Sequence, residues 1–284
     1  MPALNEEPTI GPVVEVLARL RSRGLVDEVI VIDSGSSDRT REIASDRGAS
    51  VVVDYEIMPE LGPAKGKGEA MYKGLAVSKG DLVVWVDADV SDFDERFVVG
   101  LVGPLLVDPS IVFVKAFYAR PLKAEMVGVE GQSLPVDLSG QGSTTSGHVV
   151  GEGGRVTELT ARPLLACLFP AVAEVTQPLS GEYAARRWLV EAIPFDTGYG
   201  VDVGILIDAV RVVGTDRIAE CDLEVRHHRN RSLRELAPMA AEVAYAVLRR
   251  FPGMDSALAE LSAPSQSGPA LLEPATTAQR PPLA

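Results

Sequence analysis

The chain has 284 residues, 46% of them hydrophobic, and this size suffices for one large domain or for one domain with an appendage. Its formal net charge of −13 at pH 7 argues against general nucleic-acid binding, and it means that an anionic substrate needs a local basic cluster. No apolar run reaches the roughly 18 residues of a transmembrane helix, and the first residues lack the basic start and apolar core of a signal peptide. We therefore expect a cytoplasmic protein that binds neither nucleic acid nor membranes.

Strand and helix patterns alternate through the first 120 residues. Helices are predicted at residues 8–23, 39–47, 67–78 and 96–106, and strands at 28–33, 49–53, 82–86 and 111–117. This alternation predicts a Rossmann-like α/β fold with a mostly parallel sheet, right-handed crossovers and helices on both faces. Ligands bind such sheets at the carboxyl ends of the strands, where the pattern places Asp33, Ser34, Asp87 and Asp89.

The pattern changes in the second half of the chain. Residues 121–153 are rich in Gly and Ser with little periodicity, which predicts a mobile loop. Residues 154–262 are regular again and predict a mixed α/β part. Its expected elements include a helix at 199–213, a strand at 218–225 and a helix at 233–250. Residues 263–284 are rich in Pro, Ala and Ser, and we predict a disordered tail.

The segment Pro2–Glu7 precedes the first predicted helix, at the point where a doubly wound sheet has just completed its first strand. Without that strand, backbone groups of the neighbouring strand would lack partners. We therefore expect the first half to lack its first strand and the natural chain to start upstream of Met1.

Two carboxylates follow the apolar run at 82–86. Asp87 and Asp89 are two positions apart, so they point to the same side where the strand ends. Burying two neighbouring acids requires a cation, and oxygen ligands of this kind favour Mg²⁺ or Mn²⁺. A solvated, Asp-rich turn is the alternative interpretation.

Two further stretches suit phosphate groups. Lys67 lies between Gly66 and Gly68 at a helix start, where small neighbours allow close approach and the ammonium can bind a diphosphate. Gly154, Arg155 and Thr157 combine turn amides, a guanidinium and a hydroxyl, which favours a phosphate clamp. A solvated lysine and an ordinary helix-start loop are the respective alternatives.

The order and spacing of eight segments carry a family resemblance over roughly residues 2–250. The segments Pro2–Glu7, Asp33–Ser36, Gly66–Glu69 and Asp87–Asp89 resemble the nucleotide-sugar (donor) half of a GT-A glycosyltransferase. The segments Gly154–Leu159, Gln177–Ala184, Gly198–Gly204 and His228–Arg231 resemble the glucosyl-3-phosphoglycerate synthases of actinobacteria and their mannosyl-3-phosphoglycerate relatives. This resemblance implies that residues 1–120 bind the donor and residues 154–262 bind the acceptor.

The resemblance also implies roles for individual residues. Donor-binding positions are Ala3, Leu4, Glu6, Ser34, Lys67, Asp87, Ala88, Tyr199 and Asp202, and acceptor-binding positions are Gly154, Arg155, Val156, Thr157 and Asn230. It implies Asp89 and His228 as ligands of Mg²⁺ or Mn²⁺, and Asp89, Lys67 and Asp202 as the catalytic residues. Mycobacterial members have Glu at the position of Asp202, so the choice between glucose and mannose stays open.

The implied reaction is a metal-dependent, retaining transfer of glucose or mannose from a nucleoside-diphosphate sugar to the 2-hydroxyl of 3-phosphoglycerate, by a homodimer. Alternatives are another family 2-like GT-A enzyme such as a polyprenyl-phosphate sugar transferase, a nucleotidyltransferase, or a non-catalytic nucleotide-sugar-binding protein. The sequence leaves open whether the base is uridine or guanosine. It also leaves open whether retention uses a covalent intermediate, with Glu182 or Asp202 as candidate nucleophiles, or a front-face transfer.

Overall fold

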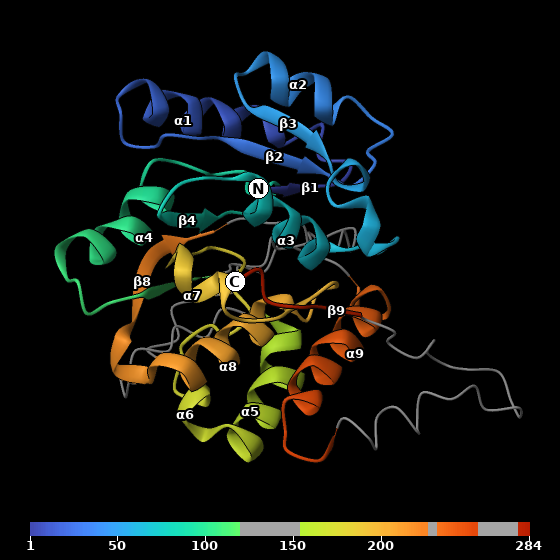
Figure 1. Ribbon diagram of the computed structural model, residues 1–284, viewed down its shortest axis with the longest axis vertical. Coiled ribbons are helices and arrows are strands. Elements are labelled where there is room, and N and C mark those ends of the chain that lie inside the picture. Colours follow the sequence, from blue (N-terminus) through green and yellow to red (C-terminus); the bar gives the residue numbers. More distant parts are fainter. Residues whose placement is uncertain (120–153, 227–231, 255–277) are drawn as a thin grey trace, which may run out of the picture.

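Three parallel strands form the first sheet of the protein, for which a computed structural model describes residues 1–119, 154–226, 232–254 and 278–284. The strands are β1 (Pro2–Ala3), β2 (Ile30–Asp33) and β3 (Ser50–Val53), in the order β1-β2-β3. Helices α1 (Ile10–Ser22) and α2 (Thr40–Asp46) are the crossovers between them (Figure 1). One face of α1 is buried because apolar residues recur at helical spacing along it.

A short first strand is present. Pro2 and Ala3 pair with Ile32 and Asp33 of β2. The sequence predicts that the first strand is missing, and the structure has two residues of strand in that place. A cavity of about 540 Å³ lies between β2 and β4 (Leu82–Trp85) and is lined in part by residues of both strands.

The second sheet has the order β4-β6-β5-β8 and is mixed. Its other strands are β5 (Phe113–Ala119), β6 (Tyr183–Arg186) and β8 (Ile218–Val225). Strand β6 is antiparallel to both of its neighbours, β4 and β5, whereas β5 and β8 are parallel. The sequence analysis did not predict β6, which at four residues carries little periodic signal.

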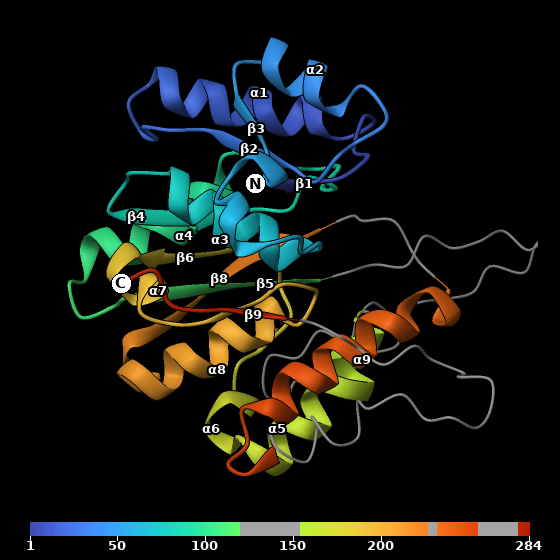
Figure 2. The same ribbon diagram turned by 45° about the vertical axis from the view of Figure 1, so that its right-hand side comes forward.

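Helices cover both faces of this sheet, as predicted (Figure 2). The remaining helices are α3 (Lys67–Val77), α4 (Arg96–Val107), α5 (Arg162–Leu168), α6 (Pro170–Ala173), α7 (Arg187–Glu191), α8 (Val201–Val213) and α9 (Leu233–Arg249). Alternate residues of β6 belong to different cores. Tyr183 and Ala185 pack with α3 and α8, whereas Ala184 packs with α1 and α4. The predicted helices and strands of the first 119 residues are confirmed within a few residues at their ends.

The end of the chain differs from its prediction. Residues 278–284 belong to the described structure, and β9 (Gln279–Arg280) pairs antiparallel with β7 (Phe195–Asp196). The disordered tail expected at 263–284 is therefore wrong for these seven residues, because Arg280 has a buried carboxylate partner that composition does not reveal. The loop expected at 121–153 lies outside the described residues. None of the helices in the described ranges is long and apolar enough to cross a membrane.

Candidate active site

Lys67 links two carboxylates at the centre of the candidate site. Its Nζ atom lies 2.8 Å from Asp87 Oδ1 and 2.9 Å from Asp202 Oδ2. Lys67 is the first residue of α3, Asp87 follows β4, and Asp202 lies in the first turn of α8. Three residues predicted from separate segments of the sequence are thus in direct contact.

Arg226 contacts both Asp87 and Asp89. It directly follows β8, and its Nη2 atom lies 3.0 Å from Asp87 Oδ2 and 2.8 Å from Asp89 Oδ1. Asp87 is therefore flanked by two cations, one on each oxygen, whereas Asp89 is the more exposed acid. The two carboxylates lie side by side, since both contact Arg226 Nη2, and Ala88 between them is buried.

A buried carboxyl group extends the network behind Arg226. Glu182 Oε1 lies 3.2 Å from Arg226 Nη2, and the Tyr118 hydroxyl donates to Glu182 Oε2 at 2.7 Å. Arg226 Nη1 in turn donates to the Tyr118 hydroxyl oxygen at 2.8 Å. Glu182 Oε2 thus accepts a hydrogen bond, whereas Oε1 is paired with Arg226 by charge without a hydrogen bond, and the side chain is fully buried.

The pKa values follow from burial and from these partners. Burial raises the pKa of Asp87, but Lys67 and Arg226 outweigh it and hold that pKa well below its usual range. Burial lowers the pKa of Lys67, and here too the two carboxylates prevail, so the net shift is upward. For Glu182 burial dominates and its pKa is raised despite Arg226. A fixed ammonium and a fixed carboxylate therefore meet at the centre of the site.

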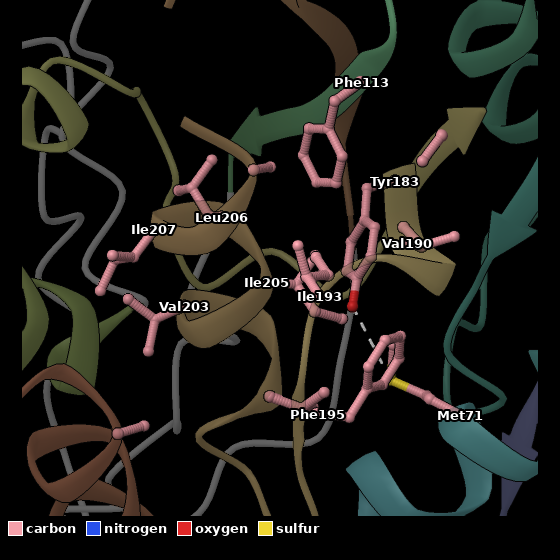
Figure 3. Packing of buried hydrophobic residues seen from close by; sticks show 14 of the residues in the cluster. Met71, Phe113, Tyr183, Val190, Ile193, Phe195, Val203, Ile205, Leu206 and Ile207 are labelled. Carbon is pink, nitrogen blue, oxygen red and sulfur yellow. Dashed lines mark hydrogen bonds between the residues drawn. The ribbon is translucent and has the colours of Figure 1, made fainter. Parts of the chain in front are cut away.

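A second lysine lies next to the backbone of Asp202. Lys115, on β5, is completely buried, and its Nζ atom lies 3.4 Å from the Asp202 carbonyl oxygen and 4.2 Å from the ring centroid of Tyr183. The Tyr183 hydroxyl donates to Asp202 Oδ1 at 3.3 Å, and Figure 3 shows that hydroxyl pointing toward Met71 of α3. Burial lowers the pKa of Lys115 to about 8. The Asp202 carboxylate is therefore held by two groups, the Tyr183 hydroxyl on Oδ1 and the Lys67 ammonium on Oδ2.

The amino-terminal donor residues gather around the end of β2. Ser34 N donates to the Ala3 carbonyl oxygen at 3.0 Å, and Glu6 N donates to Thr40 Oγ1 at 2.8 Å. Leu4, between them, is half exposed. Ala3 and Ser34 are thus in direct contact at the end of β2, and Glu6 contacts the first residue of α2; their roles in donor binding stay predictions.

The remaining predicted residues belong to other segments of the chain. Gly154 has a φ of 84°, and Arg155, Val156 and Thr157 begin the turn that leads into the π-helical segment Thr157–Ala161 and α5. Tyr199 N donates to Glu242 Oε2 of α9 at 2.6 Å, and Tyr199 is partly exposed just before α8. His228 and Asn230 lie outside the described residues. Their roles stay predictions.

The residues present fit a hard divalent cation. Asp87 and Asp89 offer carboxylate oxygens at one strand end, and an imidazole from His228 is a compatible third ligand. Within the described ranges no group of three or more Asp, Glu, His or Cys side chains is arranged so that it could hold a metal ion.

Sequence reasoning missed Arg226, Tyr118 and Lys115 as members of the site. Arg226 had one usable signal, because it directly follows a predicted strand whose end faces the carboxylates. Tyr118 and Lys115 lie on β5 among apolar residues, and their pattern is that of an ordinary core strand. Glu182 appeared only as a candidate nucleophile, and the structure shows it bound to Arg226 and Tyr118.

Comparisons with known proteins agree with this geometry. Residues 1–128 match the model of glycosyl transferase family 2. The glucosyl-3-phosphoglycerate synthase of Mycolicibacterium smegmatis is 47% identical over 256 residues, which cover 90% of this chain and 78% of that protein. The synthase of Petrotoga mobilis is 44% identical over 252 residues, covering 88% and 71%.

The solved structures point the same way. A crystal structure of the Mycobacterium tuberculosis synthase in complex with Mn²⁺, UDP-glucose and glycerol 3-phosphate superposes with a TM-score of 0.78 at 40% identity, covering 99% of this chain and 88% of that one. With the GT-A arrangement of strand ends, Lys67 and paired aspartates in place, the chain belongs to the glucosyl-3-phosphoglycerate synthase family of hexosyltransferases.

Proposed function

We propose that this protein transfers glucose from UDP-glucose to the 2-hydroxyl of 3-phosphoglycerate. The proposal rests on the contact of Lys67 with both Asp87 and Asp202, which fixes one ammonium at the start of α3. It is supported by the relatives: the M. tuberculosis synthase has been crystallised with Mn²⁺ and UDP-glucose, and with Mn²⁺, UDP and glucosyl-3-phosphoglycerate.

Lys67 is the residue that binds the leaving diphosphate in this proposal. Its raised pKa keeps it charged at every physiological pH, and a fixed charge aimed at developing negative charge is an effective form of catalysis. We assign Asp202, which Lys67 and Tyr183 hold in place, to the hydroxyls of the donor sugar. Asp89 and His228 would hold Mg²⁺ or Mn²⁺, which when bound neutralises charge on the diphosphate.

The acceptor is assigned to the turn at Gly154–Thr157. Its backbone amides, with the Arg155 guanidinium and the Thr157 hydroxyl, suit a phosphate monoester, and Asn230 would join them. An acidic protein can bind an acidic acceptor in this way because the positive groups are local.

Front-face transfer is the mechanism that the geometry favours. Glu182 is ion-paired with Arg226 and accepts a hydrogen bond from Tyr118 through Oε2, and the two oxygens of Asp202 contact Lys67 and Tyr183. A nucleophile in either position would have to break these contacts. A leaving phosphate that takes the acceptor proton needs no such rearrangement. The homodimer and the cytoplasmic location stay predictions.

Nucleotide release by the purified protein tests the proposal. The assay contains Mn²⁺ and compares UDP-glucose, GDP-glucose and GDP-mannose, each with and without 3-phosphoglycerate. We expect release that depends on 3-phosphoglycerate and is fastest with UDP-glucose. Preference for GDP-mannose would overturn the sugar assignment, and release that ignores the acceptor would overturn the acceptor assignment.

A further inference from the structure

The last seven residues of the chain lie against the elements that carry Lys67 and Asp202. Strand β9 pairs with β7, with Arg280 opposite Phe195 and Gln279 opposite Asp196. Thr197, directly after β7, donates through both its amide and its hydroxyl to the Ala278 carbonyl oxygen, at 3.0 and 3.1 Å. Figure 2 shows β9 running beside α8, which begins at Val201 just beyond this contact.

Arg280 binds a buried carboxylate on α3. Its Nε atom donates to Glu69 Oε2 at 2.7 Å and its Nη2 atom donates to Oε1 at 2.9 Å, a paired arrangement that fixes both side chains. The same guanidinium donates to the carbonyl oxygens of Leu61 and Gly62, at 2.7 and 3.1 Å. Glu69 is fully buried, and its pKa is lowered because Arg280 and Lys73 outweigh the effect of burial.

The contact between Arg280 and Glu69 lies two residues from Lys67, in the first turn of α3. Gly66 caps this helix without a side-chain hydrogen bond, so the first amides need partners from elsewhere. Gly68 N and Glu69 N donate to the carbonyl oxygens of Gly198 and Thr197, at 3.3 and 2.9 Å. The fit is close, since a Cβ atom at Gly68 would lie 1.8 Å from the Asp196 carbonyl oxygen.

These contacts connect residues 278–284 to the first turn of α3 by two routes. The terminal segment holds Thr197 through Ala278, Thr197 holds the first turn of α3, and Arg280 holds that same turn through Glu69. Lys67 at the start of α3 and Asp202 in the first turn of α8 are joined across it at 2.9 Å. Both ends of the Lys67–Asp202 contact therefore depend on the backbone that the terminal segment secures.

We propose that residues 278–284 position Lys67 for catalysis, with Arg280 as the positioning residue that acts through Glu69. The effect on turnover rests on the function proposed above, whereas the effect on the first turn of α3 does not. Because we assign Lys67 to the leaving diphosphate and Gly154–Thr157 to the acceptor, loss of Arg280 lowers kcat and leaves the KM for 3-phosphoglycerate unchanged.

The test compares Arg280→Met with Arg217→Met in the full-length protein. Arg217 is a matched control, because it also donates to a backbone carbonyl oxygen, that of Ser110, but lies beyond the end of α8 that is opposite to Asp202. We expect Arg280→Met to lower kcat at least tenfold with the KM for 3-phosphoglycerate within twofold, and Arg217→Met to change neither. Glu69→Gln lowers kcat similarly, and the double variant loses little more than either single one.

Hydrogen exchange supplies a readout that needs no turnover. The amides of Gly68 and Glu69 exchange faster in Arg280→Met, while those of α1 keep their rates. A kcat equal to that of Arg217→Met, or unchanged exchange at these two amides, would overturn the proposal. If the parent protein shows no acceptor-dependent turnover, the proposed function has failed, and the exchange result still decides the positioning role.

A conservative variant covers a folding failure of Arg280→Met. Arg280→Lys keeps a positive charge beside Glu69 and loses the paired geometry and the two carbonyl contacts. For Arg280→Lys we expect a kcat roughly threefold below that of the parent, with the KM for 3-phosphoglycerate again unchanged. An Arg280→Lys protein with full kcat and parental exchange at Gly68 would refute the role of the guanidinium.

Discussion

Lys67 Nζ lies 2.9 Å from Asp202 Oδ2, although the two residues are 135 positions apart in the chain. Each belongs to the first turn of its helix, α3 and α8, so two helix starts meet at this contact. The side chains are largely buried, with exposed fractions of 13% and 8%. An ammonium so enclosed is a fixed charge with little freedom to turn away from a bound diphosphate.

Replacing Lys67 with Met removes that charge and leaves Asp87 and Asp202 without their shared partner. We expect kcat to fall by about 100-fold or more, which is typical when a preorganised electrostatic contact is lost. Lys79→Met serves as control, because Lys79 is an exposed lysine just beyond the end of α3. Steady-state nucleotide release measures both variants, and equal rates would show that Lys67 does not act on the donor.

Asp87 and Asp89 are expected to differ in their contribution to stability. Asp87→Asn breaks contacts with two buried cations and should lower the free energy of unfolding by about 3–5 kcal/mol. Asp89→Asn affects a side chain that is 37% exposed, so its cost should stay near or below about 1 kcal/mol. Urea denaturation followed by circular dichroism compares the two. Similar losses would mean that Arg226 does not distinguish the carboxylates.

Lys115 predicts a specific dependence of stability on pH. Its pKa falls from the usual 10.5 to about 8 in the folded protein, so between these values the unfolded chain binds more protons than the folded one. Stability therefore rises with pH across this window, by roughly 3 kcal/mol for this group.

Lys115→Met removes the titrating group while roughly keeping its volume. The contribution is isolated by the difference in unfolding free energy between the parent and this variant, measured by urea denaturation from pH 7 to 10. Above pH 8, the unfolding free energy of the parent should rise relative to that of the variant. A constant difference over the whole range would contradict a lowered pKa for Lys115.

Gly181 leaves room for the Asp87 carboxylate. A Cβ atom at Gly181 would lie 2.2 Å from Asp87 Oδ2, so Gly181→Ala must displace that side chain from its contacts with Lys67 and Arg226. We expect kcat to fall by about tenfold to 100-fold. Gly103→Ala is the control, because Gly103 lies within α4 and a Cβ there meets nothing within 4 Å. That variant should stay fully active and gain about 0.5–1 kcal/mol of stability. Parental kinetics for Gly181→Ala would show that Asp87 tolerates displacement.

Local sequence patterns sufficed for the first half of the fold and for the centre of the site. The apolar run at 82–86 with Asp87 and Asp89 beyond it predicted a strand with two acids at its end, and the glycines around Lys67 predicted a helix start. These features depend on residues that are neighbours in the chain.

The missed features depend on residues that are distant in the chain. Glu182 meets Tyr118 and Arg226 only after β6 has entered the sheet, and Arg280 meets Glu69 across 211 positions. Neither Glu182 nor Arg280 differs in its local sequence from an ordinary surface charge. Long-range pairing of this kind leaves no periodic signal, so the sequence analysis placed Arg280 in a disordered tail and overlooked β6.

The position of β6 has a consequence for biosynthesis. This strand comes from residues 183–186 but separates β4 from β5, which both emerge from the ribosome earlier. Until residues 183–186 have been translated, those two strands have open edges, which are prone to pair with other chains. The segment that matches the family 2 model therefore cannot complete its own sheet while it is the only part synthesised. Folding of the segment up to residue 119 should wait for residues 183–186, and ribosome-bound chains shorter than about residue 186 are the ones that need chaperones most.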